Sequence, residues 1–273
     1  MNDYISLSAG QVGLAASLIV VNGLVSLVLR LGMERTLALA SLRTVVQLLL
    51  VGFVLEWVFA VDRWYLVIAI LSIMTLAAGI TAGQRNRRRF PGIWLNTIVS
   101  IWAASWLVTA FGLFVVIRDM TTWYQPQYAI PLLGMVLGNS LNGTSIGLNA
   151  FTETLVARRE QVEAALTLGA TRWEAARKPL QEAVRTGMIP IINAMMVVGI
   201  VSLPGMMTGQ LLSNAKPMDA VKYQIVIMFL IASATALCTV CVILLSFLRF
   251  FNTKHQFLYR RIDFAVETVR TAR

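Results

Sequence analysis

The segment KYQIVIMFLIASATALCTVCVILLSFL, residues 222–248, contains no charged residue after its first lysine. A helix of about 20 apolar residues is long enough to cross the hydrocarbon core of a bilayer, because each residue adds about 1.5 Å. Lipid offers no hydrogen bonds to a peptide group, so a segment of this kind must be helical inside a membrane. This stretch therefore predicts an α-helical membrane protein.

The composition extends that prediction to the whole chain. Of the 273 residues, 58% are hydrophobic and 13% are charged, whereas soluble domains contain about 25% charged residues. The mean hydropathy is +0.73. No linker rich in Pro or Ser and no long repeat divides the sequence, so we expect a single membrane domain over residues 1–273. The first residues lack the basic segment with which a cleaved signal peptide begins.

Apolar runs of about 20 residues predict seven transmembrane helices. The expected spans are 7–29, 36–60, 64–83, 93–117, 127–151, 187–212 and 222–248. Most of the 23 Lys and Arg residues lie in four segments outside the spans, namely 30–35, 84–92, 152–186 and 249–273. Cytoplasmic loops are enriched in basic residues, so the N-terminus is predicted outside and the C-terminus in the cytosol. The net charge of +10 is assigned to the surface of the lipid membrane, and nucleic acid is not an expected partner.

The largest predicted cytosolic segment, 152–186, contains the sequence EAALTLGATRWEAARKPL, residues 163–180. Gly169 is suited to end one helix, because glycine readily adopts a positive φ. Thr171 and Glu174 have the capping-box spacing that begins a second helix. Apolar side chains cluster around the turn at Leu166, Leu168 and Trp173. A helical elbow of this kind suits docking into a groove of a partner protein; a plain hairpin lying on the membrane is the alternative.

Three motifs resemble known transporter sequences. The spacing Glu163-Ala164-Ala165-x3-Gly169 resembles the EAA motif of importer-type ABC-transporter permeases, whose short coupling helix sits in a cleft of a cytosolic ATPase. The segments PLLGMVLGNSLNGTSIGL (131–148) and VSLPGMMTGQLLSNAKPMDAVKYQI (201–225) are similar to the signature segments of the FetB family. That family comprises membrane subunits of a bacterial ABC exporter linked to iron efflux, with plant relatives linked to aluminium tolerance. The similarity runs from about residue 35 to 255.

The resemblance implies a homodimeric permease of the bacterial inner membrane that exports iron or another metal species with a separate cytosolic ABC ATPase. It assigns coupling to the ATPase to Glu163, Ala164, Ala165, Leu168, Gly169, Ala170, Thr171 and Arg172. A Walker A loop needs a lysine after a glycine, and no lysine here follows one. We therefore expect no enzymatic site in this chain, with ATP and Mg held by the partner. A non-metal substrate such as a sugar nucleotide or lipid, or an ion-coupled secondary transporter, remains an alternative.

Small and polar residues within the spans predict close helix contacts. Glycines four residues apart let helices approach closely in lipid, and they occur as Gly134 with Gly138, Gly143 with Gly147, and Gly205 with Gly209. Two interpretations of these glycines are open: packing between helices of one chain, and contact between two chains of a dimer. Asn139, Asn142 and Asn149 lie on roughly one helical face. Amides in lipid need partners, so this face is predicted either to line a transport pathway or to bind neighbouring helices.

The sixth predicted span is interrupted at Pro204 and Gly205, because proline lacks an amide donor. We interpret the interruption as a gate or a re-entrant turn. Met206 and Met207 follow directly, and thioethers bind soft metal ions rather than hard iron. Methionine in an apolar helix is more often a packing residue, so the sequence predicts no metal site here.

One further polar pair lies in the second predicted span. Arg43 and Gln47 are one helical turn apart. Long basic side chains near a membrane surface extend toward water, whereas a buried polar pair marks a cavity. For Arg43 and Gln47, extension toward water and a place in a cavity are both consistent with the sequence.

Overall fold

The computed structural model describes residues 8–61, 63–116 and 125–262. Within these ranges the chain is helical, and its only β-type pairings are two isolated bridges. The predicted all-α class is confirmed. Contacts divide the chain into two compact units, Met1–Arg63 and Trp64–Arg273, and each is described by itself.

The first unit is a pair of helices, α1 (Ala9–Val28) and α2 (Glu34–Val61). Helix α1 begins with a capping box in which the Ser8 amide donates to Gln11 Oε1 at 2.7 Å. The turn between the helices is held by Ser26, whose hydroxyl accepts from the Met33 amide at 3.0 Å. Only 6% of the apolar window of each helix is buried, as expected for side chains that face lipid.

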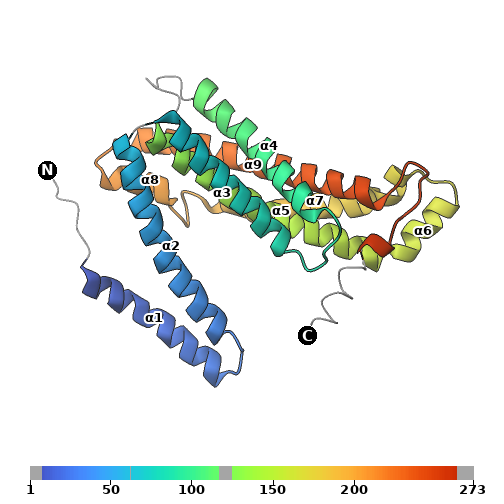
Figure 1. Ribbon diagram of the computed structural model, residues 1–273, viewed down its shortest axis with the longest axis horizontal. Helices are drawn as coiled ribbons and strands as arrows, with labels where there is room; N and C mark the ends of the chain where they lie inside the picture. The colour runs from blue at the N-terminus through green and yellow to red at the C-terminus, as the bar shows by residue number, and fades with distance from the viewer. Residues whose placement is uncertain (1–7, 62, 117–124, 263–273) are drawn as a thin grey trace. The chain divides into compact units, whose positions relative to one another are not determined.

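The second unit contains the remaining helices. They are α3 (Trp64–Gln84), α4 (Ile93–Phe111) with the π-helical extension η1 (Gly112–Val116), α5 (Pro126–Ala157), α6 (Arg159–Thr167), α7 (Arg172–Val197), α8 (Gly205–Leu212) and α9 (Pro217–Phe250). Helix α5 is central, because it packs against α3, α4, α7 and α9. Within this unit α6 lies at one end and α8 at the other (Figure 1).

Five described helices are long and apolar enough to cross a membrane: α1, α2, α3, α4 with η1, and α9. The predicted count of seven spans is therefore not confirmed. The expected span 127–151 lies within α5, which has 32 residues. Its Gly, Asn, Ser and Thr residues lower its hydropathy, and Ser140 and Thr144 are fully buried. Helix α5 faces other helices rather than lipid, so its composition differs from that of the outer spans.

The expected span 187–212, interrupted at Pro204 and Gly205, differs from the observed helices in where it begins and where its break starts. Helix α7 begins at Arg172 within the predicted cytosolic segment and continues to Val197. The chain then turns, with Gly199 at φ +82°, and α8 begins only at Gly205. Helix α7 continues through Gly187, where the predicted span begins, so its charged first half and its apolar second half form one helix.

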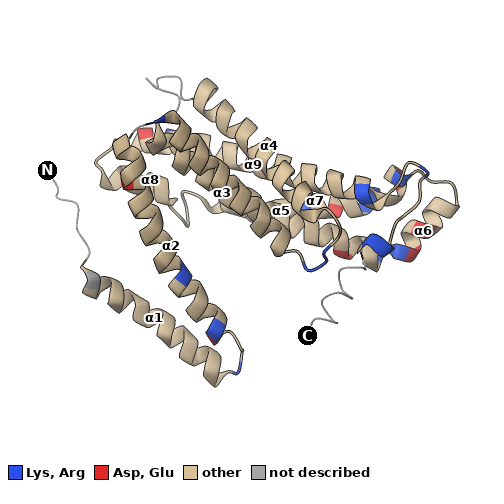
Figure 2. Cartoon of the chain, in the orientation of Figure 1, with Lys and Arg blue, Asp and Glu red and all other residues tan. Residues whose placement is uncertain are grey.

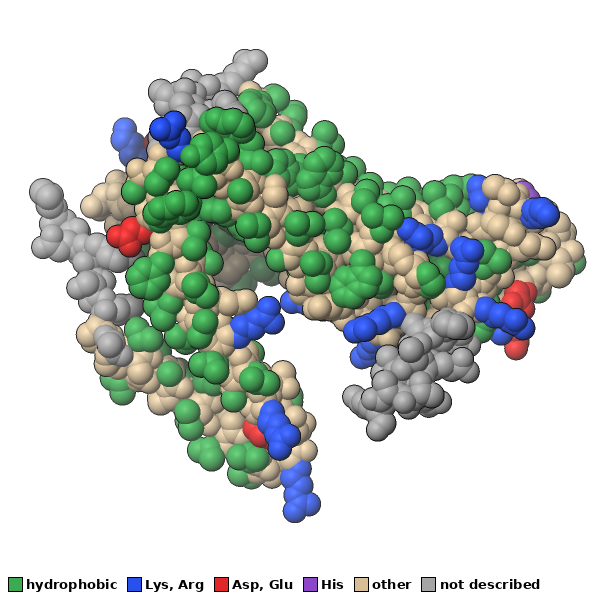
Figure 3. Space-filling view, in the orientation of Figure 1, with side chains coloured by type: hydrophobic (Ala, Val, Ile, Leu, Met, Phe, Trp, Pro, Cys, Tyr) green, Lys and Arg blue, Asp and Glu red, His purple; other side chains and the backbone are tan. Residues whose placement is uncertain are grey.

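The basic residues of the second unit concentrate at its α6 end (Figure 2). Segment 84–92, segment 152–186 and the residues after α9 meet there, as expected for loops on one side of a membrane. Apolar side chains cover the exposed surface of α3 and α4 (Figure 3), including Ile73 and Trp102. The assignment of the α6 end to the cytosol stays a prediction. Arg118 and the tail beyond Ile262 lie outside the described residues.

Helices α5 and α7 are in close contact through glycines. A Cβ atom on Gly187 would lie 2.8 Å from the Gly143 carbonyl oxygen and 3.1 Å from Gly147 Cα. On the other side, Thr239 Cγ2 of α9 would lie 2.7 Å away. Gly143 and Gly147 therefore pack within the chain.

The other predicted packing glycines have more space around them. A Cβ on Gly134 would meet only Met74, at 3.3 Å. A Cβ on Gly138, Gly205 or Gly209 would meet nothing within 4 Å. For these glycines the dimer seam stays a prediction.

We predict that Gly187→Ala destabilises the protein by about 1–3 kcal/mol, because the new methyl group meets backbone atoms that cannot rotate away. The measurement is the melting temperature of the purified protein in detergent. Gly138→Ala is the matched control, since its Cβ meets no atom within 4 Å. Equal melting temperatures for the two variants would contradict the close contact.

Candidate functional site

The turn after α6 is a Schellman motif centred on Gly169. The Ala170 amide donates to the Ala165 carbonyl at 3.0 Å, and the Gly169 amide donates to the Leu166 carbonyl at 3.1 Å. Gly169 has φ +92°, a value that glycine adopts without a steric penalty. The predicted end of the first helix is confirmed. We call α6, this turn and the first turn of α7 the elbow.

The second helix of the elbow begins with the predicted capping box. The Thr171 amide and hydroxyl both donate to Glu174 Oε2 at 2.7 Å. The Glu174 amide donates in return to the Thr171 hydroxyl at 3.4 Å. These hydrogen bonds favour the carboxylate, so the pKa of Glu174 is lowered, chiefly by the Thr171 side chain. Both ends of the turn are thus fixed by local hydrogen bonds.

Residues that follow α9 complete the elbow. The Arg172 amide donates to His255 Nδ1 at 3.0 Å, and the Arg172 guanidinium donates to the Asn252 carbonyl at 3.3 Å. The Arg159 guanidinium lies 4.0 Å from the centre of the Tyr259 ring. The two hydrogen bonds of Arg172 join positions 83 and 80 residues apart. The sequence analysis did not predict them, because no local pattern indicates such a pairing.

The tip of the elbow carries an uncovered apolar side chain. Leu168 is 88% exposed and Trp173 is 47% exposed. The centroids of the Trp173 ring and the Phe247 ring of α9 are 4.2 Å apart. Leu166 instead packs against the buried apolar cluster that contains Phe247. Of the remaining predicted coupling residues, Ala164 is exposed and Ala165, Ala170 and Arg172 are half-buried. Glu163 forms an ion pair of 2.8 Å with Arg159 on the same helix.

The elbow is packed onto the long helices. Val162 of α6 and Ala176 of α7 are buried in one apolar cluster with Leu155 of α5 and Phe247 of α9. An ion pair of 2.8 Å also joins Arg158 to Glu182. A displacement of the elbow therefore pushes directly on α5, α7 and α9, because close-packed side chains transmit movement.

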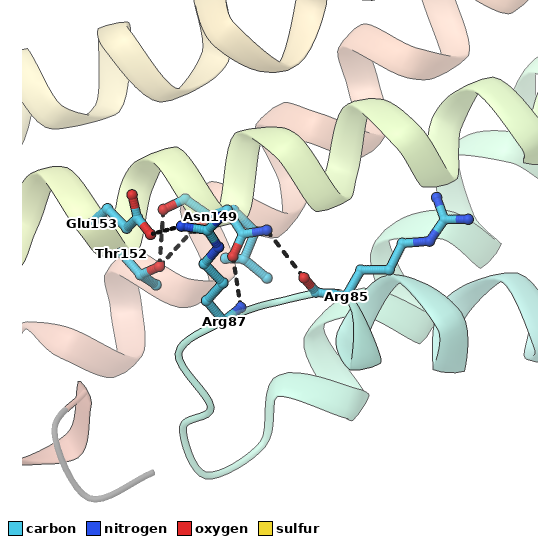
Figure 4. Close-up of polar contacts among 6 residues, drawn as sticks. Arg85, Arg87, Asn149, Thr152 and Glu153 are labelled. Atoms are coloured by element: carbon cyan, nitrogen blue, oxygen red, sulfur yellow. Dashed lines mark hydrogen bonds and ion pairs between the residues drawn. The ribbon is translucent and has the colours of Figure 1, made fainter. Parts of the chain in front are cut away.

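Two of the three predicted asparagines bind the basic loop between α3 and α4, and Figure 4 shows the contacts of Asn149. Asn149 Oδ1 accepts from the Arg87 amide at 2.8 Å, and Asn149 Nδ2 donates to the Arg85 carbonyl at 3.2 Å. Asn142 Oδ1 accepts from the Arg85 guanidinium at 2.8 Å. Asn139 instead donates to the Met135 carbonyl of its own helix. Asn142 and Asn149 thus have partners in the loop after α3, and both the helix-binding role and the transport pathway along this face stay predictions.

The chain breaks before Pro204, as its sequence indicates, although the break already starts at Val198. Pro204 is the residue before α8, and Gly205 is its first residue. Met206 packs against the apolar cluster around Ile191. Met207 lines a pocket between α7, α8 and α9. Their role as a gate stays a prediction.

Arg43 and Gln47 lie on α2 in the first unit, and both side chains are exposed. Neither forms a hydrogen bond or ion pair with another residue in the described ranges.

Long apolar helices whose outer side chains are hydrophobic define a multi-pass membrane protein. Residues 9–251 match the family described as "Uncharacterised protein family (UPF0014)", and the chain belongs to that family. The family match includes the two segments, 131–148 and 201–225, that resemble the FetB family, and it extends over most of the described helices.

Three relatives illustrate the family. A UPF0014 membrane protein of Synechocystis is 38% identical over 79% of this chain and 83% of its own length. The "Probable iron export permease protein FetB" of Escherichia coli is 28% identical over 96% of this chain and 99% of its own length. The protein "ALUMINUM SENSITIVE 3" of Arabidopsis thaliana is 30% identical over 93% of both chains. No solved structure matches the chain.

We predict that Asn149→Leu speeds tryptic cleavage of the loop after Arg85 about tenfold, because two hydrogen bonds to the loop backbone are lost. The measurement is the rate of cleavage in open membrane fragments. Asn139→Leu is the control, since that amide contacts only its own helix. A loop that is cleaved equally fast in both variants would show that the asparagine does not hold it.

The capping box predicts a pH dependence of the elbow. The pKa of Glu174 is lower in the folded protein than the value of about 4.3 in an unfolded chain. Its stabilising contribution is therefore complete above that unfolded value and is lost as the pH falls through the folded value. We expect hydrogen exchange of the first amides of α7, corrected for intrinsic rates, to accelerate in this acid range. Glu174→Gln should lack this acceleration, and an identical acid response in that variant would refute the assignment.

Proposed function

We propose that this protein is the membrane-spanning permease subunit of an ATP-driven ABC exporter. A separate cytosolic ATPase binds ATP and Mg and docks on the elbow, and two copies of the permease form the transporter in a bacterial inner membrane. The family membership supports this proposal, together with the similarity to the Escherichia coli protein named as a probable iron export permease.

The observation that carries the proposal is the exposed Leu168 at the tip of a rigid turn. An apolar side chain with 88% exposure, held between two capped helix ends, is suited to fill a pocket on a partner. Interface anchors of this kind supply much of the binding energy of a complex. The elbow lies at the basic end of the second unit (Figure 2), where the positive-inside rule predicts the cytosol.

Helix α7 supplies a path from the ATPase into the membrane. It has 26 residues, which corresponds to a length of about 39 Å. Its first turn belongs to the elbow, and its last turn borders the break before α8. A movement of the docked ATPase would thus reach the opposite end of the second unit through one helix.

The proposed substrate is iron or another metal species. In the described ranges no group of three or more His, Cys, Asp and Glu side chains could hold a metal ion. Transport of a metal would then rely on amide or backbone oxygens or on a chelate. A non-metal substrate such as a sugar nucleotide or lipid is the second candidate, supported by the lack of clustered carboxylates in the described helices.

The test uses inverted membrane vesicles in which this chain is co-expressed with a candidate ABC ATPase. ATP-dependent accumulation of radioactive iron that requires both chains would support metal export. Accumulation without ATP or without the ATPase would overturn the ABC assignment in favour of a secondary transporter. An ATPase that binds the membrane through this chain without iron accumulation would retain the permease and reject iron.

We predict that Leu168→Asp reduces the amount of ATPase retained on the vesicles about tenfold, because a carboxylate would be buried in the docking pocket. Iron accumulation should fall in parallel. Leu212→Asp is the matched control, since that leucine is 67% exposed on α8 at the opposite end of the unit. Normal ATPase retention by the Leu168 variant would exclude the elbow tip as the docking anchor.

A further inference from the structure

A groove of about 330 Å³ lies between α7 and α9 in the second unit. Helix α7 contributes Gln181, Val184 and Arg185 to its walls, and α9 contributes Val240 and Leu244. The groove thus combines an apolar wall with one charged and one amide side chain, and both of these polar side chains are exposed.

Two contacts of α7 with α9 bound the groove along the helices. On the elbow side the rings of Trp173 and Phe247 pack together, and on the other side Gly187 lies against Thr239. Leu244 precedes Arg249 by five residues, which is about 8 Å along a helix axis. The groove therefore lies close to the end of the unit at which the basic residues gather (Figure 2).

The charged side chain of this groove has no partner. Arg185 forms no hydrogen bond or ion pair with any residue in the described ranges. The acidic residues of the two wall helices already have partners: Glu174 contacts Thr171, Glu182 pairs with Arg158, and Asp219 pairs with Lys222. The wall helices thus leave no free carboxylate for the Arg185 guanidinium.

The surroundings of Arg185 make an outside partner favourable. An arginine that faces lipid without a counter-charge is costly. Its long side chain can extend along the apolar wall toward the membrane surface, where lipid phosphates lie. Val240 belongs to the exposed apolar residues of α9, so this wall is open to an occupant from the bilayer.

The two kinds of wall together select the occupant. A water-soluble anion would pair with Arg185 but would leave the apolar wall uncovered. A hydrocarbon chain alone would cover that wall but would leave the guanidinium and the Gln181 amide without partners. An anionic phospholipid supplies both an acyl chain and a phosphate. A zwitterionic lipid such as phosphatidylcholine fits less well, because its ammonium group is repelled by the guanidinium.

We propose that this groove binds one anionic phospholipid, whose phosphate accepts hydrogen bonds from the Arg185 guanidinium and whose acyl chain covers Val184, Val240 and Leu244. The Gln181 amide offers a second donor to the same headgroup. The site rests on the membrane location of the helices and does not involve the ATPase or the elbow, so a failure of the transport proposal leaves it unaffected.

The test uses two photoactivatable lipids, phosphatidylglycerol and phosphatidylcholine, with the same diazirine-bearing acyl chain. The full chain is reconstituted in phosphatidylcholine nanodiscs that contain a small, equal fraction of one probe, and labelled residues are located by peptide mass spectrometry. We expect phosphatidylglycerol to label the groove about fivefold more, the preference that one basic side chain near a membrane surface gives to an anionic lipid. The internal reference is the exposed apolar face of α3 and α4 at Ile73 and Trp102, which both lipids should label equally.

The variants locate that preference. Arg185→Gln should lower the labelling of the groove by phosphatidylglycerol about fivefold, whereas Arg185→Lys should keep more than half of it, since lysine retains the charge. Arg89→Gln is the matched control, because Arg89 is exposed in the loop after α3 and does not line the groove. Unchanged labelling of the α3 and α4 reference shows that each variant is folded.

Three results would overturn the proposal. The first is equal labelling of the groove by the two lipids in the wild-type protein, or labelling by phosphatidylglycerol that Arg185→Gln leaves unchanged. The second is loss of groove labelling in an excess of glycerol 1-phosphate, which would make Arg185 a site for a water-soluble anion. The third is a groove that neither lipid labels, and cross-linking of two copies through Val240→Cys would then assign this face to a second copy of the chain.

Discussion

The structure of the second unit depends on the direct contact of the α5 and α7 backbones at Gly143, Gly147 and Gly187. No layer of side chains separates the two helices there, so they cannot slide without breaking a contact of backbone with backbone. Thr239 of α9 fills the third side of this junction. The junction therefore fixes the middle of α7, while one end of that helix belongs to the elbow and the other borders the break before α8.

Amide side chains hold the basic loop at the α6 end of the unit. Four arginines lie in the loop after α3. Among the described residues, Arg87 forms an ion pair of 3.7 Å with Glu153, and both side chains are largely exposed. Such a pair contributes little. Asn149 instead binds the loop backbone at two points. Asn96 similarly accepts from Arg249 at 2.8 Å and donates to Ser246. Amides can fix the shape of a basic loop without neutralising its charge.

The sequence predicted the local features of the elbow correctly, because they follow from short-range chemistry. Gly169 ends one helix by its positive φ, and Thr171 with Glu174 begins the next. The continuous α7 was not predicted, since hydropathy averages treat its charged and apolar halves as different segments. The contact of His255 with Arg172 joins positions 83 residues apart, and no pattern of spacing reveals it. The hydrogen bonds of Asn149 on α5 with the loop after α3 likewise follow from no spacing pattern in the sequence.

The contacts of Asn252 and His255 with Arg172 give the elbow an order of assembly. Asn252 and His255 are translated 80 and 83 positions after Arg172, which takes roughly 4 to 17 s at about 5–20 residues per second. Their contacts with the elbow can form only after helix α9, which precedes them, has been synthesised. A nascent chain therefore has an incomplete elbow until the residues after its last described long helix are made, and a protein that recognises only the complete elbow would not bind before then.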